Sequence, residues 1–293
     1  MNIGDYIADL SKLTEQALDR LVPAADVLPV TIHQAIRYSL FAGGKRIRPV
    51  LCLATSEAVA GYVEGIESVA ATLEMIHTYS LIHDDLPALD NDDLRRGRPT
   101  NHKVYGDAMA ILAGDSLLTL AFEVLGKLDT DPKIAIQLVA ELATASGTVG
   151  GMIGGQVEDI QGEGQPPTAE LLDRIHRAKT GALLKASVRM GAIYAGATSQ
   201  QLKALTQYGE HIGLAFQIVD DVLDVVESSE ALGKTAGKDA AQQKITFPAV
   251  YGLQRSKEMA EQQLLLAHLA LAGFNETAAP LRAIADLIVH RKA

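Results

Sequence analysis

Apolar residues recur at intervals of three and four positions along almost the whole chain of 293 residues. This spacing places them on one face of an α-helix, whereas the period-two runs typical of strands are absent. No break between helical segments is long enough or polar enough to be a domain linker. We therefore predict an all-α protein, a single large bundle of roughly ten or more helices forming one domain over residues 1–293. The predicted helices span residues 3–21, 31–42, 49–60, 66–83, 108–128, 132–146, 168–195, 199–227, 245–255, 256–272 and 277–291.

The composition narrows the class of protein. A hydrophobic share of 48% is ample for a large core, and the formal net charge of −10 argues against binding to nucleic acid. The single cysteine, Cys52, cannot form an internal disulfide, which fits a reducing compartment. No apolar run of about 18 residues is free of charge, so no membrane span is expected. Residues 1–13 lack the basic start of a signal peptide, and we expect a cytoplasmic protein.

Three aspartates, Asp84, Asp85 and Asp90, stand at the end of an apolar helix. At a separation of ~4 Å each pair of charges costs about 1 kcal/mol in water and roughly 4 kcal/mol at an effective dielectric constant near 20. A bound metal ion removes that cost, and oxygen ligands without nearby cysteine suit Mg²⁺. Because Pro87 interrupts helical hydrogen bonding, we expect the helix to break and a loop to return Asp90 to the side of Asp84. The alternative is an ordinary solvated acidic helix end.

A second acidic cluster, Asp220, Asp221 and Asp224, lies far downstream in another apolar helix. Asp220 and Asp224 are separated by four residues and share a helix face, with Gln217 one turn earlier. One such cluster is a weak signal, but two on apolar helices predict a metal-binding site for a highly charged ligand.

Basic residues accompany both clusters. The turn at residues 43–49 combines two glycines, which let the backbone approach an anion, with lysine and arginine, which bind phosphate groups. His77, Ser80 and Asp84 lie along one stripe of the same helix, so His77 could point into the site. Further basic residues follow the aspartates or lie in an apolar helix: Arg95, Arg96, Arg98, Lys179, Lys234, Lys238 and Lys244.

Together these motifs resemble those of the trans-isoprenyl diphosphate synthase family. Within that family, they are most similar to the motifs of the bacterial farnesyl diphosphate synthases. The matching segments are GGKRIRP at 43–49, HDDLPALDNDDLRRGRPTNH at 83–102, KTGAL at 179–183, GLAFQIVDDVLD at 213–224, LGK at 232–234, and Lys244 before Thr-Phe-Pro at 246–248. The resemblance covers essentially the whole chain. It implies an all-α bundle around a deep central cavity, of the isoprenoid synthase type, assembled as a homodimer.

The resemblance also implies roles for individual residues. The two aspartate clusters would hold three Mg²⁺ ions on the allylic diphosphate, with Asp84, Asp85, Asp90, Asp220 and Asp224 as metal ligands and Asp221 in the second motif. The positions that match contacts to the allylic diphosphate are Arg95, Lys179, Thr180, Gln217, Lys234 and Lys244. Those that match the isopentenyl diphosphate site are Gly44, Lys45, Arg48, His77 and Arg96. Gln156 and Asp159 match a further family motif, although the glycines beside them could serve helix packing alone.

The family's reaction ionises an allylic diphosphate, joins the cation to isopentenyl diphosphate and releases a proton, with the released diphosphate as base. Among the catalytic positions, Lys179 and Lys234 would assist the leaving group. Tyr79 stands five residues before Asp84, about 7.5 Å along the helix axis. The resemblance implies that this aromatic residue, beside Ser80, forms the floor that stops the product at C15, farnesyl diphosphate, although the helical wheel aligns Ser80 with Asp84 instead.

Several alternatives remain open. Within the family, the product could be geranylgeranyl or geranyl diphosphate. A metal phosphohydrolase would use His83 and Asp84, but it needs further histidine ligands, and His102, His176 and His211 are scattered along the chain. A non-catalytic subunit of a prenyl transferase heterodimer is disfavoured by the intact aspartates. A terpene cyclase would leave Lys45 and Arg48 without a function.

Overall fold

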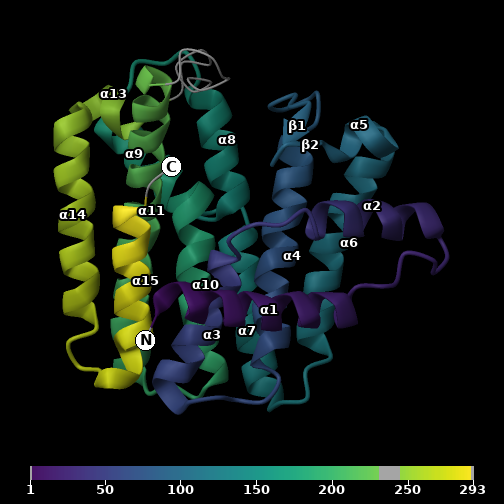
Figure 1. Ribbon diagram of the computed structural model, residues 1–293, viewed down its shortest axis with the longest axis horizontal. Coiled ribbons are helices and arrows are strands. Elements are labelled where there is room, and N and C mark those ends of the chain that lie inside the picture. Colours follow the sequence, from purple (N-terminus) through teal and green to yellow (C-terminus); the bar gives the residue numbers. More distant parts are fainter. Residues whose placement is uncertain (1, 231–244, 292–293) are drawn as a thin grey trace. The chain divides into compact units, whose positions relative to one another are not determined.

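The computed structural model describes residues 2–230 and 245–291, and helices dominate them (Figure 1). Strands are limited, in these residues, to β1 (Leu94–Arg95) and β2 (Arg98–Pro99), which pair as an antiparallel hairpin. The all-α prediction is therefore confirmed. The chain divides into two compact units, Met1–Leu53 with Tyr62–Val139 and Ala54–Gly61 with Ala140–Ala293. The single domain and the central cavity stay predictions.

The first unit is built around α4, a helix whose buried residues face almost every direction. It starts after Gly65, whose φ of +85° suits glycine, and it packs along α6 and α1. Gly114 on α6 leaves space for the His83 side chain of α4, because a Cβ there would lie 2.1 Å from the His83 Nε2 atom. The helices of this unit are α1 (Ile3–Leu21), α2 (Val30–Leu40), α3 (Ile47–Ala60), α4 (Ile66–Asp84), α5 (Asn101–Tyr105), α6 (Asp107–Gly126) and α7 (Pro132–Ser146), with unit boundaries inside α3 and α7.

By length and composition, α6 could cross a membrane, and it is the one such helix in the described parts of the chain. The sequence analysis expected no membrane span because no apolar run of about 18 residues is free of charge. Helix α6 does contain the charged residues Asp115 and Glu123, but it is apolar on average. A core helix passes the same test. The packing of α6 along α4, with Ala113, Leu117 and Ala121 fully buried between neighbours, is typical of a core helix.

The second unit is organised around α11, which packs against α10, α14 and α15 (Figure 1). Its apolar face contributes Leu214, Ile218 and Val222 to a core cluster that also contains Phe247. The helical elements of this unit are α8 (Met152–Gly162), α9 (Ala169–His176), the π-helical turn η1 (Arg177–Gly181), α10 (Ala182–Tyr194), α11 (Ser199–Glu230), α13 (Phe247–Tyr251), α14 (Leu253–Ala270), the 3₁₀ turn η2 (Glu276–Ala278) and α15 (Ala279–His290).

Most predicted helices agree with the structure within a few residues, and the disagreements have local causes. The segment predicted as one helix at 168–195 contains the π-helical turn η1, which apolar spacing cannot reveal. The segment predicted at 245–255 is interrupted at Gly252, whose φ is +80°. The short helix α5, the glycine-containing helix α8 and the hairpin β1–β2 were not predicted, because each is short or weakly periodic.

Candidate functional site

The first acidic cluster has the local geometry that the sequence analysis predicted. Helix α4 ends at Asp84, just before Pro87. The Asp90 backbone N–H donates to the Asp84 carbonyl oxygen at 2.8 Å, and the Asp92 N–H donates to the Asp85 carbonyl oxygen at 3.2 Å. The loop therefore returns Asp90 to the end of the helix, beside Asp84. Both of these aspartates are half-buried.

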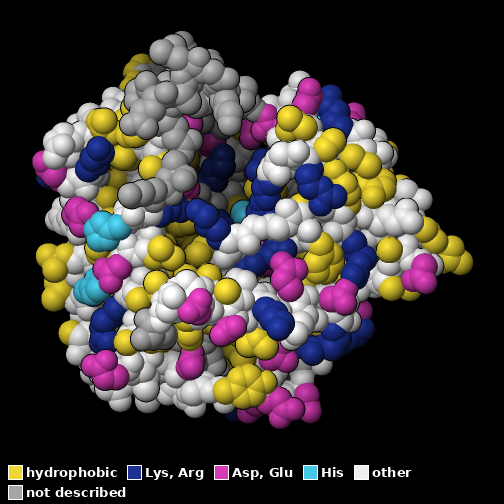
Figure 2. Space-filling view, viewed as in Figure 1, with side chains coloured by type: hydrophobic (Ala, Val, Ile, Leu, Met, Phe, Trp, Pro, Cys, Tyr) yellow, Lys and Arg dark blue, Asp and Glu magenta, His cyan; other side chains and the backbone are white. Residues whose placement is uncertain are grey.

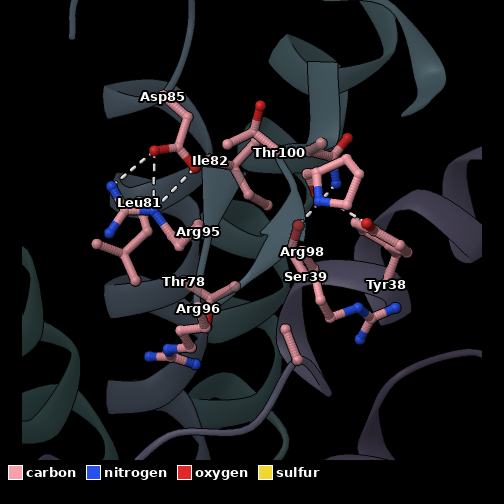
Figure 3. Close-up of a pocket in the computed structure, with 13 residues that line it drawn as sticks. Tyr38, Ser39, Thr78, Leu81, Ile82, Asp85, Arg95, Arg96, Arg98 and Thr100 are labelled. Carbon is pink, nitrogen blue, oxygen red and sulfur yellow. Dashed lines mark hydrogen bonds and ion pairs between the residues drawn. The ribbon is translucent and has the colours of Figure 1, made fainter. Parts of the chain in front are cut away.

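Asp85, the middle residue of this cluster, is bound by the protein itself. It is 3% exposed, and both of its carboxylate oxygens accept hydrogen bonds from Arg95, at 2.6 to 2.9 Å (Figure 3). Burial alone would lower the pKa of Arg95, but the hydrogen bonds and charge of Asp85 raise it above its usual value. Asp85 and Arg95 were predicted to contact metal and diphosphate respectively, and in this structure they contact each other.

Asp85 and Arg95 also line a small cavity in the first unit, whose lining residues are drawn in Figure 3. The volume of this cavity is about 30 Å³. Its lining comes from α2, α4, the β1–β2 hairpin and α5, and includes Tyr38, Thr78 and Arg96. The Arg98 guanidinium lies 4.5 Å from the centre of the Tyr38 ring. This space has the volume of about one water molecule, so it is too small for a prenyl substrate.

The basic turn at residues 43–49 lies against the arginines that follow the first cluster. The Arg96 guanidinium donates a short hydrogen bond to the Gly43 carbonyl oxygen. Gly44 has a φ of +136°, a backbone conformation that favours glycine, and a Cβ there would lie 2.8 Å from the same guanidinium. Lys45 is exposed and Arg48 is half-buried. On the molecular face drawn in Figure 2, basic side chains (dark blue) and acidic side chains (magenta) are interspersed, so anion binding must depend on local groups like this one.

His77 on α4 faces the same positive charges. Removal from water lowers the pKa of His77 well below its usual value of 6.5, and the charges of Arg48, Arg96, Arg95 and Arg46 lower it further. The imidazole is therefore neutral near pH 7. It can donate one hydrogen bond to an anion without adding charge.

Tyr79 and Ser80 occupy neighbouring positions on α4. Tyr79 is 5% exposed, its ring packs edge-on against His83 with centroids 5.8 Å apart, and its hydroxyl has no hydrogen-bond partner among the described residues. Burial raises the pKa of Tyr79 to about 12, with a smaller effect from the charge of Asp84. Ser80 donates to the carbonyl oxygen of His77 at 2.9 Å. Their predicted role in limiting product length is not tested by these contacts.

The second acidic cluster also has a buried middle aspartate. Asp221 is 3% exposed and accepts hydrogen bonds from Gln217 Nε2 at 2.8 Å and from the Phe247 backbone N–H at 2.9 Å. The His176 Nε2 atom lies 3.3 Å from the same carboxylate, and the His176 ring stacks on Phe247. Gln217 in turn accepts from the Thr180 hydroxyl at 2.9 Å. Three predicted residues, Thr180, Gln217 and Asp221, are therefore joined in one hydrogen-bonded chain.

Asp220 and Asp224 are half-buried on α11. Asp220 forms a short ion pair with Arg291, whose guanidinium also donates to the Phe216 carbonyl oxygen at 3.0 Å and lies 4.1 Å from the centre of the Phe216 ring. Burial lowers the pKa of Arg291, and the charge of Asp220 partly opposes this. The basic residue that accompanies Asp220 thus comes from the far end of the chain.

Lys179 lies on the π-helical turn η1, where its ammonium group pairs with Asp159 at 2.6 Å. The turn is held closely on two sides. A Cβ at Gly155 would lie 2.2 Å from the Lys179 nitrogen, and one at Gly213 would lie 3.0 Å from the Gly181 Cα atom. Gly155 therefore serves helix packing, as one reading of the sequence suggested, while Asp159 positions Lys179. Gln156 has a buried side-chain oxygen without a partner among the described residues.

Two predicted contacts, Lys234 and Lys244, lie outside the described residues. Conversely, the sequence analysis assigned no role to Arg46, His176 or Arg291. Of these, His176 lies beside Asp221 in the structure. Arg46 stands inside a quoted motif and could have been considered there. His176 and Arg291 carry no local signal, because they meet the aspartates only through tertiary packing.

The side-chain donors of the two acidic clusters are carboxylate oxygens, which suit Mg²⁺. Among the described residues, no group of three or more His, Cys, Asp and Glu side chains is gathered as a complete metal site. Mg²⁺ in phosphate-binding enzymes commonly takes one or two carboxylates, with waters and substrate oxygens as its other ligands. Asp84 with Asp90, and Asp220 with Asp224, offer such partial sets, so the residues fit the ion. The carboxylates of Asp85 and Asp221 instead accept hydrogen bonds from Arg95 and from Gln217 and the Phe247 N–H, respectively.

Comparison with known proteins identifies the family of this chain. Two relatives are the heterodimeric geranylgeranyl pyrophosphate synthase large subunit 1, chloroplastic, of Arabidopsis thaliana (48% identical; 98% of this chain, 79% of the relative) and the geranylgeranyl diphosphate synthase of Cyanophora paradoxa (46%; 99% and 97%). The crystal structure of an FPP/GFPP synthase from Zymomonas mobilis is similar with a TM-score of 0.87 at 36% identity, covering 98% of this chain and 99% of that one. The family model described as Polyprenyl synthetase matches residues 29–285. The chain therefore belongs to the polyprenyl synthetase family and has its all-α isoprenoid synthase fold.

Proposed function

We propose that this protein is a short-chain prenyl transferase, which joins isopentenyl diphosphate to an allylic diphosphate and releases diphosphate. The observation that carries the proposal is the pair of aspartate clusters, each with a buried, hydrogen-bonded middle aspartate and half-buried outer aspartates. Structural acidic patches on a surface need no such internal support. The proposal requires the two clusters to face one another, which stays a prediction.

The residues supply the chemistry as follows. Bound Mg²⁺ would act as a Lewis acid on the diphosphate leaving group. Lys179, held by Asp159, would neutralise charge that develops on that group. Cleavage of the C–O bond would give an allylic cation and free diphosphate, and attack by the double bond of isopentenyl diphosphate would form the new carbon–carbon bond and a second cation. Loss of a proton from that cation to the released diphosphate would form the new double bond. Gly44, Lys45, Arg48, neutral His77 and Arg96 would hold the diphosphate of isopentenyl diphosphate.

Product length has two candidates. Geranylgeranyl diphosphate, C20, is the first, because the relatives compared above are named geranylgeranyl synthases. Farnesyl diphosphate, C15, which the sequence analysis expected, is the second. It is favoured by Tyr79, a bulky side chain buried on α4 five residues before Asp84. The structure compared from Zymomonas mobilis is named for farnesyl and geranylfarnesyl products.

Product analysis tests the proposal directly. The purified chain, incubated with Mg²⁺, isopentenyl diphosphate and dimethylallyl diphosphate, should form C15 or C20 prenyl diphosphate, separated by chromatography after phosphatase treatment. Release of phosphate without a new carbon–carbon bond would indicate a phosphohydrolase instead. Activity that appears only with a second, different subunit would indicate a heterodimer component.

Tyr79→Ala tests whether this side chain limits chain growth. If it does, the variant should make products at least one C5 unit longer than the wild type, because the smaller side chain leaves room for the tail. Tyr62→Ala is the matched control, since Tyr62 is 74% exposed in the turn before α4. An unchanged product distribution in Tyr79→Ala would remove Tyr79 as the limiting residue.

We also infer a homodimer in the cytoplasm. The Arabidopsis relative is named as a heterodimer subunit and as chloroplastic, so both points need measurement. Light scattering of the purified chain should give twice the monomer mass of 31.2 kDa. A monomer mass would contradict the homodimer.

A further inference from the structure

Arg46 belongs to the basic turn at residues 43–49 but points away from the solvent. Its neighbour Lys45 is exposed, whereas the Arg46 side chain is 1% exposed. All three guanidinium nitrogens have partners. Nε donates to Glu15 at 2.7 Å, Nη1 to Glu74 at 2.5 Å, and Nη2 to the Leu40 carbonyl oxygen at 2.6 Å. This geometry leaves no face of the guanidinium for a substrate.

The pair between Arg46 and Glu74 lies in the interior, with the Glu74 side chain 3% exposed. Burial alone would lower the pKa of Arg46, but the charge and hydrogen bond of Glu74, followed by those of Glu15, raise it above the usual value. Arg46 is therefore a permanent buried cation. Removing one member of such a pair leaves a buried charge without its counter-ion, which is strongly unfavourable.

The backbone of Arg46 adds a second constraint. Its φ of +48° lies in the left-handed region, which residues other than glycine rarely adopt. Such a conformation persists where the surrounding structure holds it. Here the side chain provides that hold, because its partners come from α1 (Glu15), α4 (Glu74) and the end of α2 (Leu40).

Glu74 connects the buried Arg46 side chain to His77, one of the groups proposed to bind the diphosphate. Glu74 lies three residues, or about one helical turn, before His77 on the same face of α4. The Arg46 charge acts on His77, together with the charges of Arg48 and Arg96. The pair of Arg46 and Glu74 thus joins the turn that carries Lys45 and Arg48 to the helix that carries His77.

We propose that Arg46 is a positioning residue, which with Glu15 and Glu74 fixes Lys45, Arg48 and His77 for the diphosphate of isopentenyl diphosphate. This inference rests on the proposed function. Arg46 does not touch the substrate. Its loss should therefore impair the use of isopentenyl diphosphate selectively, while the use of the allylic substrate, which is assigned to other residues, should change little.

The test compares KM for the two substrates in three variants. Arg46→Met removes the charge at similar length, Arg46→Lys keeps the charge but cannot form the planar fork of hydrogen bonds, and Glu74→Gln removes the main counter-ion. We expect Arg46→Met to raise KM for isopentenyl diphosphate at least ~10-fold, because small displacements of binding groups have large effects on binding and rate. KM for dimethylallyl diphosphate should change less than about twofold, and Arg46→Lys and Glu74→Gln should show the same selectivity with smaller changes.

Arg20→Met is the matched control. Arg20 on α1 also pairs with a glutamate of α4, Glu67, at 3.3 Å, but its side chain is 59% exposed and far from the turn in sequence. This variant should leave both KM values unchanged. Thermal unfolding of every variant separates a loss of stability, which lowers the active fraction and kcat, from the selective change in KM.

Equal changes in KM for both substrates, or no change in either, would overturn the inference. If Arg46→Met does not fold, Arg46→Lys and Glu74→Gln decide the question by the same criterion. If the wild type makes no prenyl product, the proposed function fails separately. In that case, calorimetric titration with inorganic diphosphate tests the role of Arg46. If Arg46 positions the binding groups, diphosphate should bind at least ~10-fold more weakly to the Arg46 variants than to the wild type and to Arg20→Met.

Discussion

The two acidic clusters share a sequence pattern but are supported in different ways. In each, the second aspartate of the pair, Asp85 or Asp221, is 3% exposed and hydrogen-bonded. Asp85 is held by a charged partner, Arg95, ten residues away in the adjoining hairpin. Asp221 is held by an amide side chain and a backbone N–H, the latter from Phe247, 26 residues downstream.

The supports therefore differ in range and in charge. The first cluster ends a helix, and a short loop with its hairpin completes it. The second lies within the long helix α11, and its surroundings come from η1, α9, α13 and the segment after α15. The comparison teaches that one motif can be preorganised by a local loop or by distant packing, and that only the first kind of support is visible in a short stretch of sequence.

The largest expected effect concerns the outer aspartates. Asp84→Asn and Asp220→Asn should each lower kcat/KM for prenyl transfer at least ~100-fold, because each removes a charge assigned to stabilising the leaving group. If both clusters act on one diphosphate, the double variant should be little worse than either single variant. Steady-state assays of product formation measure this.

Asp115→Asn is the control for these variants, since Asp115 is an exposed aspartate on α6. Multiplicative losses in the double variant would show that the clusters act independently. That result would contradict the proposal that the two clusters face each other and act on one diphosphate.

A smaller effect distinguishes the two middle aspartates. Asp85→Asn should reduce the free energy of unfolding by about 2–3 kcal/mol, because it leaves Arg95 without its counter-ion, with some relief because Arg95 is one-third exposed. Asp221→Asn should cost only about 1 kcal/mol, because an amide oxygen still accepts from the Phe247 N–H. Urea unfolding at pH 7.5 measures both. Equal losses would mean that the nature of the partner does not distinguish the clusters.

The smallest effect is a pH dependence near the first cluster. The folded-state pKa of His77 is lowered, so below about pH 6.5 the unfolded chain binds a proton that the folded chain does not. The stability of the wild type relative to His77→Gln should therefore be constant above neutral pH and fall as pH decreases below that value, by at most about 1.4 kcal/mol per pH unit.

Urea unfolding of both proteins between pH 5 and 8 checks this difference, in which contributions from the other ionisable groups cancel. A difference that is independent of pH would show that His77 titrates normally in the folded protein. In that case, burial and the nearby arginines would not lower the pKa of His77 in the folded protein.

Much of this protein follows from the sequence because its structure is mostly local. Helical periodicity identified the long helices, and Pro87 explained why α4 ends where Asp90 can return to Asp84. The aspartate and basic motifs pointed to the family, which the comparisons establish. Short or strained elements were missed, notably the π-helical turn that carries Lys179, because no spacing of apolar residues encodes it.

The sequence by itself determined the helical fold, the loop that closes the first cluster and the residues that could bind a diphosphate, since these depend on neighbouring positions. Only the tertiary structure decided which charged groups face inward. It placed Arg46 between Glu15 and Glu74, and Arg291 on Asp220. The physical reason is that burial of a charge depends on partners that packing brings from distant parts of the chain.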